Sequence, residues 1–555
     1  MSYLGSRFFV FQTSADSLSD DRWRLAAFGV VGYMLALRLA YLGLVNLLPE
    51  EAYYWNFSQH VDIGYLDHPP MAAWTIWLGT SLFGNTEFGV RIGAYLSWIA
   101  AAFFLYRLTA NLFGKSTAII CIVLTATLPA FFYTGFIMTP DVPLTVAWAG
   151  ALYFLERALI ADRRQAWWGV GICAGLGTVS KYTIALLGPA ALIFLILDPK
   201  ARRWLRKPEP YVAATLALAL FSPVIYWNAI HGWAAFAFQS TQRLEDPATF
   251  STPSLLASAA LLLTPLGLIS ALAVFVSRRR RSVLAPIADV QTRRKLLLIT
   301  VFTAAPLSVF LAFSFVHQVK LDWTGPVWLA ILPAIAAMLF QSGQSSKFEV
   351  AINSLWGPTL VGTLAIYAVF LHYLVVGLPL VGHLGNIRTL PVAWDAFGHQ
   401  VGLVQQAVEK EMGQSVLLAG MDKYFVASEI AFYNRQGPDV IQKSVGAGPW
   451  KRQPDVRLLV QACRYARTDD HLVRGEKRGR RTTGPRTLFR SADGYQEPNR
   501  QEEWSFYRPV LLPRRLRISG LLYGADLMLD QVTPWRLVFQ FKSSEIRANT
   551  VKKSE

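Results

Sequence analysis

Charged residues are scarce in this 555-residue chain: they make up 16% of it, whereas hydrophobic residues make up 53%. Soluble globular proteins carry about a quarter charged residues, so this deficit excludes an ordinary soluble domain. The aromatic share is 13%, with 18 tryptophans, which is typical of the aromatic belts at membrane interfaces. The composition therefore predicts a polytopic α-helical membrane protein.

Cysteines and nucleotide motifs are also rare or missing. Cys121 and Cys173 fall in apolar segments and Cys463 in a polar one, so the sequence excludes a disulfide framework. We find no internal repeat, no P-loop and no glycine-rich nucleotide fingerprint, which argues against ATP as the driving substrate. The N-terminus has no signal-peptide cleavage site, so we expect its first apolar run to stay in the membrane.

Eleven apolar segments are candidate membrane-spanning helices, each of which needs about 20 residues. They cover residues 24–47, 88–112, 116–136, 142–159, 166–181, 183–197, 210–230, 254–277, 295–315, 323–340 and 350–378.

The net charge is +17, and between the apolar segments lysines and arginines concentrate in short loops, a pattern that favours membrane orientation over nucleic-acid binding. The basic runs at 200–207 and 278–281 fall on one side if the N-terminus is cytoplasmic, as the positive-inside rule requires. The first loop, residues 48–87, then faces the periplasm. Its apolar stretch 69–84 is too short to span and predicts a helix lying at the membrane surface.

The character of the sequence changes near residue 379, where apolar runs shorten and charges become frequent. We therefore expect a membrane domain at residues 1–378 and a periplasmic C-terminal domain at residues 379–555. A small α/β fold is favoured there by mixed apolar segments, and a strongly basic stretch follows them. These segments are residues 415–420, 426–434 and 456–463, and the basic stretch is 464–490.

The most informative stretch is EEAYYWNFSQHVDIGYLDHPP, residues 50–70, at the exit of the first span. Ionisable groups at a membrane edge indicate a functional site. Glu50 or Glu51 could act as general base for an acceptor alcohol if desolvation raises its pKa. The two acids could equally form the first turn of a helix, where negative charge favours the helix dipole. Tyr53 and Tyr54 could stack on a sugar or belong to an interface belt.

A second rigid feature is the DHPP turn, in which the prolines fix the backbone around Asp67 and His68. His68 could contact a substrate there, or the Asp–His pair could cap the following helix. Asp141 in MTPDVPL lies on the same predicted side, which favours a role in the site, and its alternative role is to cap its own helix. Carboxylates also bind Mg²⁺ or Mn²⁺, so Glu50 and Asp141 are possible metal ligands, although no cluster has clear ligand spacing.

Cations are needed wherever a phosphate leaves. Lys181, Arg243 and Lys320 are basic residues on the predicted outer side, which is otherwise poor in them, although each could simply reach lipid headgroups. Asp322 and His231 are weaker candidates on the same side. A buried position inside the protein is expected for Arg38, because an unpaired charge within a span is costly.

Several of these motifs, in this order, resemble the bacterial branch of the dolichyl-phosphate-mannose–protein mannosyltransferase-like superfamily. The branch includes transferases that add aminoarabinose or galacturonic acid to lipid A or lipopolysaccharide core. The resemblance covers residues 24–340 well and 379–435 loosely. It rests on the 50–70 stretch, FGNTEFGVRIGAYL (83–96), TPDVPL (139–144), SKYT (180–183), KLDW (320–323) and DKYFVASEIAFYN (422–434).

The resemblance implies a membrane-embedded C-type glycosyltransferase fold, a polyprenyl-phosphate-linked sugar donor and inverting transfer at the periplasmic face of the bacterial inner membrane. The acid pair of the family's first loop corresponds to Glu50 and Glu51, and Asp141 corresponds to its second-loop acid. Glu50 stands where the family more commonly has Asp. Lys181, Arg243 and Lys320 match basic positions that hold the phosphate.

The expected function is therefore a glycosyltransferase that moves a sugar from a polyprenyl phosphate to a lipid or glycolipid acceptor resembling lipopolysaccharide. A protein O-mannosyltransferase is the alternative enzyme. A transporter or flippase for a lipid-linked sugar is the alternative from another class, and would predict pseudo-symmetric halves with broken helices, which the sequence does not show.

Overall fold

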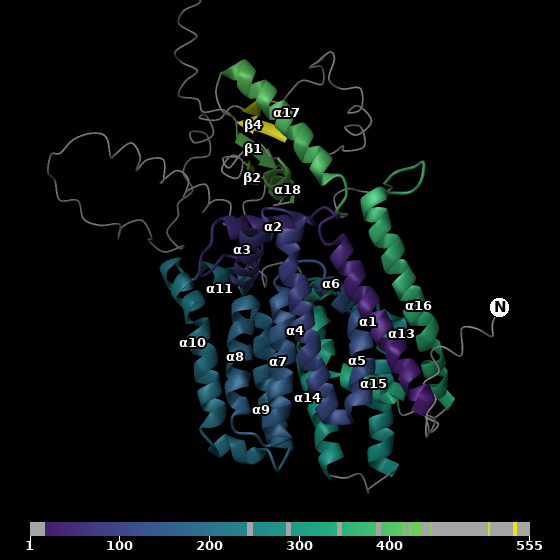
Figure 1. The fold of residues 1–555 in the computed structure, drawn as a ribbon. Coiled ribbons are helices and arrows are strands. Elements are labelled where there is room, and N and C mark those ends of the chain that lie inside the picture. Colours follow the sequence, from purple (N-terminus) through teal and green to yellow (C-terminus); the bar gives the residue numbers. More distant parts are fainter. Residues whose placement is uncertain are drawn as a thin grey trace, which may run out of the picture. The chain divides into compact units, whose positions relative to one another are not determined.

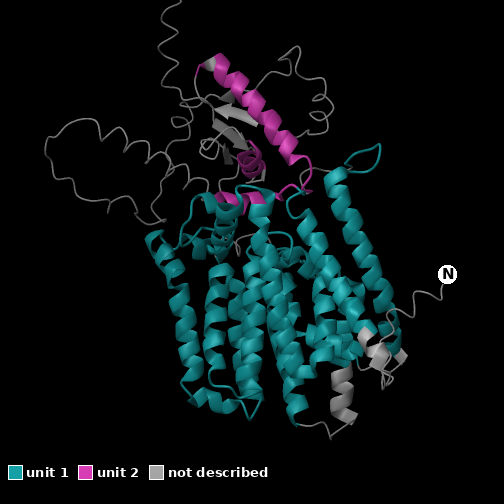
Figure 2. Ribbon diagram, viewed as in Figure 1, with its two compact units in different colours: residues 1–45, 57–385 teal, residues 46–56, 386–555 magenta. Residues whose placement is uncertain are grey.

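The computed structural model describes residues 17–240, 248–284, 290–340, 347–383, 390–413, 417–420, 425–434, 444–446, 509–510 and 537–540. The chain divides into two compact units, residues 1–45 with 57–385 and residues 46–56 with 386–555 (Figure 2).

The first unit is built from helices, most of which run side by side (Figure 1). Its long helices are α1 (Ser17–Tyr41), α4 (Glu87–Phe113), α7 (Asp141–Leu159), α8 (Ala166–Ser180), α10 (Glu209–Ile230), α13 (Thr252–Leu284), α14 (Val290–Ser314) and α16 (Lys347–Val376). Shorter ones are α3 (Met71–Phe83), α5 (Lys115–Thr127), α6 (Pro129–Thr134), α9 (Leu187–Leu197), α11 (Ala234–Gln239) and α15 (Leu332–Phe340). Three 3₁₀ segments complete it: η1 (Tyr182–Leu186), η2 (Arg202–Arg206) and η3 (Leu321–Ala330).

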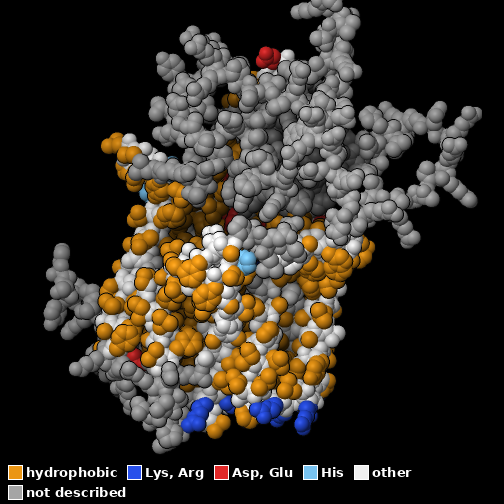
Figure 3. Space-filling view, turned by 180° about the vertical axis from the view of Figure 1, so that it is seen from behind, with side chains coloured by type: hydrophobic (Ala, Val, Ile, Leu, Met, Phe, Trp, Pro, Cys, Tyr) orange, Lys and Arg blue, Asp and Glu red, His pale blue; other side chains and the backbone are white. Residues whose placement is uncertain are grey.

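Six helices in the described residues are long and apolar enough to cross a membrane: α1, α4, α10, α13, α14 and α16. The bent pair η3 and α15, which meet at 56°, would form a seventh span. Only 17% of the apolar window of α1 and 22% of that of α10 is buried inside the protein. The outer face of the helices is accordingly hydrophobic, with lysines and arginines gathered at one end (Figure 3). Such helices need an apolar surrounding, so the protein is a multi-pass membrane protein.

All eleven predicted spans fall on helical segments, but several of these segments are short or broken. Residues 116–136 split into α5 and α6 because Leu128 has an extended backbone before Pro129, as a residue that precedes proline prefers. α8 ends at Ser180 because Lys181 is extended, with φ −158° and ψ 133°. The stretch predicted to lie at the membrane surface, 69–84, contains α3.

The break between α5 and α6 explains the position of Arg38, which is fully buried. Its Nη2 donates to the carbonyl oxygens of Ala126 at 2.9 Å and Phe131 at 3.3 Å. These carbonyls lie at the end of α5 and in α6, where the helical hydrogen-bond ladder is interrupted. The guanidinium also lies 4.6 Å from the centroid of the Trp98 ring. Arg38 thus faces the protein interior, as predicted, and binds backbone carbonyls rather than a carboxylate.

A buried ion pair holds the other end of α7. Arg294 Nε donates to Asp198 at 2.7 Å, and both side chains are at most 6% exposed. Arg294 Nη2 also donates to the carbonyl of Leu159, the last residue of α7, at 2.5 Å. A cation at a helix C-terminus satisfies carbonyls that lack an intrahelical partner and favours the helix dipole. Both ends of α7 are therefore held by charged groups, since α7 begins at Asp141.

The second unit contains helices and a small sheet. Its helices are α2 (Pro49–Gln59), whose last turn belongs to the first unit, α17 (Trp394–Met412) and α18 (Phe425–Tyr433). Its strands are β1 (Leu417–Gly420), β2 (Ser444–Gly446), β3 (Pro509–Val510) and β4 (Leu537–Gln540), in the order β2-β1-β4-β3. β1 pairs parallel with β2 and antiparallel with β4, which pairs antiparallel with β3.

The core of the second unit is formed by α17 and α18, through Trp394, Val401, Val426, Ile430 and Tyr433. Of the segments expected to be ordered in this region, 415–420 contains β1 and 426–434 contains α18. Residues 456–463 and the basic stretch 464–490 lie outside the described residues.

Candidate active site

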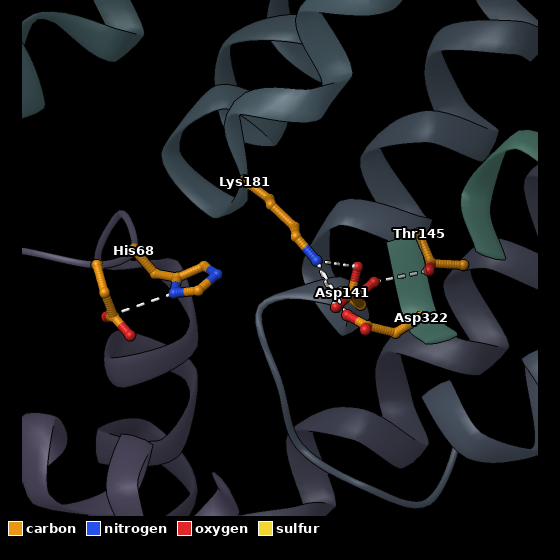
Figure 4. Close-up of polar contacts among 6 residues, drawn as sticks. His68, Asp141, Thr145, Lys181 and Asp322 are labelled. Atoms are coloured by element: carbon orange, nitrogen blue, oxygen red, sulfur yellow. Dashed lines mark hydrogen bonds and ion pairs between the residues drawn. The ribbon is translucent and has the colours of Figure 1, made fainter. Parts of the chain in front are cut away.

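A cluster of three charged residues, Asp141, Lys181 and Asp322, lies at the meeting point of three elements, and the first two are buried (Figure 4). Lys181 Nζ donates to both carboxylate oxygens of Asp141 at 2.9 Å and to Asp322 Oδ2 at 3.2 Å. The side chains of Lys181 and Asp141 are 11% and 6% exposed, whereas that of Asp322 is 33% exposed. We refer to these three residues as the triad. Asp322 is thus the member through which solvent or a ligand reaches the triad.

Each member of the triad is placed by a helix end. Asp141 is the first residue of α7, where a carboxylate favours the helix dipole, and Thr145 Oγ1 donates to its backbone carbonyl at 2.6 Å. Lys181 occupies the extended residue between α8 and η1. Asp322 lies in the first turn of η3. Backbone breaks inside a membrane protein are tolerated where they line a protein interior or cavity, and here they bring charged side chains together.

The triad combines one ammonium with two carboxylates. Burial, together with the like charge of Asp322, raises the pKa of Asp141 to about 7, even though Lys181 opposes this shift. The titrations of Asp141 and Asp322 are coupled, so this value describes the pair and not Asp141 alone. Near neutral pH the triad therefore alternates between a net charge of zero and −1.

This titration predicts that anion binding weakens as pH rises. Between pH 6 and 8 the triad becomes negative, so the dissociation constant for a phosphate-bearing ligand should rise by up to about tenfold per pH unit. Folding stability changes with the same sign. The folded chain keeps a proton that the unfolded chain, with an ordinary pKa of 3.8, has lost. The stabilisation is present at low pH and is lost as pH rises towards 7.

Asp141→Asn provides the check, with the dissociation constant of a phosphate-bearing ligand measured from pH 6 to 8. The amide cannot ionise, so this constant should be flat across the range in the variant. A pH dependence that survives in Asp141→Asn would contradict the prediction.

The cavity beside the triad has a volume of about 100 Å³. Lys181 and His68 provide its charged or chargeable groups, and Phe310 and Trp323 provide apolar wall. It is lined by His68, Pro69, Lys181, Tyr182, Thr183, Gln239, Phe310 and Trp323. Ligand pockets for whole small molecules are several times larger. The cavity therefore suits a phosphate-sized group rather than a complete lipid-linked sugar.

The loop that carries His68 is held in place by hydrogen bonds to its backbone. Tyr65 OH donates to the carbonyls of Phe57 at 3.0 Å and His60 at 2.9 Å, and Gln239 Nε2 donates to the carbonyl of Asp67. His68 Nδ1 lies 3.3 Å from Asp67 Oδ1, so that the carboxylate orients the imidazole.

Gly64 allows this loop to pack directly on α10. A Cβ at Gly64 would lie 2.5 Å from the ring of Trp227, whose Nε1 donates to Asp62 Oδ2 at 3.0 Å. His231, a weaker candidate from the sequence, stacks on the same Trp227 ring at 4.0 Å. His231 therefore supports the loop and is not among the residues that line the cavity.

The other predicted residues of the first loop, Glu50, Glu51, Tyr53 and Tyr54, lie in the second unit. Glu51 is fully buried, and its Oε2 accepts a hydrogen bond from the Leu48 backbone at 3.0 Å. A side chain that reaches back from the third helical position to the cap is half of a capping box. Glu51 thus stabilises the start of α2, which was one of its two predicted roles. Glu50, in the same turn, is half-buried.

Tyr53 and Tyr54 are 8% and 7% exposed, and their rings meet edge to face at 5.4 Å. Burial of this kind is not that of an exposed interface belt. Among the predicted cations, Lys320 is exposed and takes no part in the triad, and Arg243 lies outside the described residues. The sequence analysis treated Asp322 as a weaker candidate, and no sequence feature indicated that η3 would bring it within 3.2 Å of Lys181.

A divalent cation does not fit the donor set at Asp141, because both of its carboxylate oxygens already contact the Lys181 ammonium. Within the part of the chain that the structure describes, no group of three or more His, Cys, Asp or Glu side chains converges on one point.

Known proteins resemble the chain over this region. Residues 67–227 match the family model described as dolichyl-phosphate-mannose-protein mannosyltransferase. A lipid A galacturonosyltransferase of Rhizobium johnstonii is 31% identical over 192 residues, which are 33% of this chain and 38% of that protein. An undecaprenyl phosphate-α-4-amino-4-deoxy-L-arabinose arabinosyl transferase of Erwinia tasmaniensis is 30% identical over 145 residues, 25% of this chain and 26% of that protein. The chain thus spans less than half the length of each relative.

The structure resembles solved structures over a longer part of the chain than the sequence matches cover. ArnT from Cupriavidus metallidurans, solved with bound undecaprenyl phosphate, superposes with a TM-score of 0.55 at 16% identity and covers 79% of this chain and 88% of that one. Its apo structure superposes with a TM-score of 0.50 at 17% identity, covering 75% of each chain. At such identities the similarity establishes a shared fold. The match over residues 67–227, which include Asp141 and Lys181, confirms the predicted resemblance to the dolichyl-phosphate-mannose-protein mannosyltransferase family.

Proposed function

We propose that the chain is an inverting glycosyltransferase of the bacterial inner membrane. It transfers a sugar from a polyprenyl-phosphate donor to a lipid or glycolipid acceptor of the lipopolysaccharide type at the periplasmic face, as part of cell-envelope glycosylation. The observation that carries this proposal is the triad beside a small cavity lined by Lys181 and His68. Of these residues, His68, Asp141 and Lys181 fall within the family-matched range 67–227. The named functions of the relatives, on lipid A and with undecaprenyl phosphate, support the donor and acceptor classes.

The proposed transfer is a single displacement. The acceptor oxygen attacks the anomeric carbon, the bond from that carbon to the phosphate oxygen breaks, and the phosphate leaves with the electron pair. Glu50 takes the acceptor proton as general base. Lys181, with Asp141 and Asp322 setting its position, stabilises the charge that develops on the phosphate. His68 is the second proposed phosphate contact.

The remaining predicted residues keep supporting roles in this proposal. Glu51 orients the start of α2, Tyr53 and Tyr54 shape the surroundings of the acids, and Arg243 and Lys320 attract the anionic donor. We propose eleven spans with a cytoplasmic N-terminus, which places the family's first loop outside. The C-terminal region, 379–555, is the proposed periplasmic α/β domain that receives the acceptor.

The test is a transfer assay with the full-length protein in proteoliposomes. Undecaprenyl-phosphate donors carrying labelled galacturonic acid, 4-amino-4-deoxyarabinose or mannose are offered together with lipid A and a membrane-protein fraction. Label in the glycolipid fraction is the expected result. Label in protein would instead identify a protein O-mannosyltransferase. Donor that crosses the bilayer without a new glycosidic bond would identify a flippase.

A further inference from the structure

Glu50 and Glu51 lie in a segment that belongs to the second unit. The residues on either side of this segment in the sequence belong to the first unit. The first unit contains Val45, whose carbonyl accepts from Arg91 at 2.6 Å, and Phe57, whose carbonyl accepts from Tyr65 at 3.0 Å. Between them, residues 46–56 belong with residues 386–555. The chain is thus anchored on either side of the acid segment, and the segment itself depends on other contacts.

Two hydrogen bonds fix the entry to α2 within the second unit. The Leu47 backbone N–H donates to the Tyr433 hydroxyl at 2.7 Å. Asn46 Oδ1 accepts from the backbone N–H of Trp394, the first residue of α17, at 2.9 Å. The residue before Trp394 is Ala393, which has no side chain that can cap α17. Asn46 therefore supplies this cap from a distant part of the sequence.

Tyr433 is itself held rigidly. It is 2% exposed and is the last residue of α18. A Cβ at Gly398 would lie 2.4 Å from the Tyr433 Cβ, so α17 packs against α18 without a side chain between them. The neighbouring Phe432 ring meets Trp55 of α2 edge to face at 5.0 Å. The end of α18 thus contacts both the entry to α2 and its second turn.

These contacts determine the position of the helical turn that contains Glu50 and Glu51. Leu47 precedes Leu48, whose N–H bonds to Glu51, and Glu50 lies in the same turn. A shift of the Leu47 backbone moves this turn as a body, because its hydrogen bonds connect consecutive residues. Since a displacement of about 1 Å at a reacting group can cost about a hundredfold in rate, a rigid support for α2 has a direct effect on transfer.

We propose that Tyr433 is a positioning residue for the acid helix α2, so that the C-terminal unit orients the general base as well as receiving the acceptor. This inference rests on the proposed role of Glu50. The Tyr433 hydroxyl acts through the Leu47 amide. The effect of removing this hydroxyl on α2 and on transfer distinguishes a positioning role from a merely stabilising one.

Tyr433→Phe tests the proposal, and Tyr367→Phe is the matched control. Tyr367 is also buried, and its hydroxyl donates to the Thr127 carbonyl at 2.8 Å within the first unit. Hydrogen–deuterium exchange of the full-length proteins should show faster exchange at the amides of residues 47–56 in Tyr433→Phe and unchanged exchange there in Tyr367→Phe. This readout needs no transfer activity, so it remains informative if the proposed function fails.

The kinetic readout uses any donor that the wild-type protein transfers. Tyr433→Phe should lower kcat about tenfold with the donor KM unchanged, and it should cause no further loss when combined with Glu50→Gln. Equal exchange at residues 47–56 in Tyr433→Phe and the wild type would overturn the positioning role. An additive loss of kcat in the double variant would also overturn it, because Tyr433 would then act independently of Glu50. An equal fall in kcat in Tyr367→Phe would overturn it as well, because the loss would not be specific to Tyr433.

Discussion

Lys181→Met should abolish sugar transfer, lowering kcat by about 10²–10³-fold, the range seen when one charge-stabilising donor is removed. The same change should destabilise the protein by about 3–5 kcal/mol, because it leaves the Asp141 carboxylate buried beside Asp322 without its cation. The measurements are labelled-sugar transfer and the thermal midpoint of the purified protein in detergent.

A second substitution separates the two effects. Lys181→Met combined with Asp141→Leu removes the unpaired buried charge, so the thermal midpoint should return close to that of the wild type while transfer stays absent. The control is Asp198→Leu with Arg294→Met, which replaces a comparable buried ion pair at the other end of α7. This pair should leave transfer per folded molecule unchanged. Recovery of transfer in the Lys181 and Asp141 double variant would show that the triad serves folding alone.

Much of the fold follows from hydropathy. Apolar length predicts where the long helices of the first unit lie, because crossing a bilayer requires about 20 apolar residues whatever the tertiary contacts. The breaks are harder to predict. Pro129 gives a local signal for the split between α5 and α6, whereas nothing near Lys181 in the sequence requires an extended residue. The sequence therefore predicted which segments are helical but not where the helices end. The triad residues lie at these helix ends.

The candidate site was predictable in type and only partly in membership. Asp141 and Lys181 were both expected to be functional, and their 2.9 Å contact joins residues 40 positions apart. That contact depends on the packing of α7 against α8, which no local pattern encodes. The same reason explains Tyr433: its contact with Leu47 spans 386 positions, and a tyrosine at the end of a short helix has no distinguishing sequence signal.

Glu50→Gln should lower kcat by about 10²–10⁴-fold, the usual contribution of a general base, and leave the thermal midpoint unchanged. The amide keeps the size of the side chain but cannot accept the acceptor's proton. Glu50→Ala should likewise abolish transfer in a folded protein. Glu50→Asp keeps a carboxylate on a side chain that is one methylene shorter. This variant should therefore retain measurable transfer, with a lower kcat and an unchanged KM.

The matched control is Glu87→Gln. Glu87 is also a half-buried acid in the first turn of a helix, α4, so this change removes the same favourable interaction with a helix dipole. If Glu50 only begins α2, the two glutamine variants should behave alike, with small losses of stability and normal turnover. If Glu50 is the base, turnover falls in Glu50→Gln and not in Glu87→Gln, while both proteins remain folded. Normal turnover of Glu50→Ala would contradict the role of Glu50 as general base. The first turn of α2 would then have only a structural role, like that of Glu51.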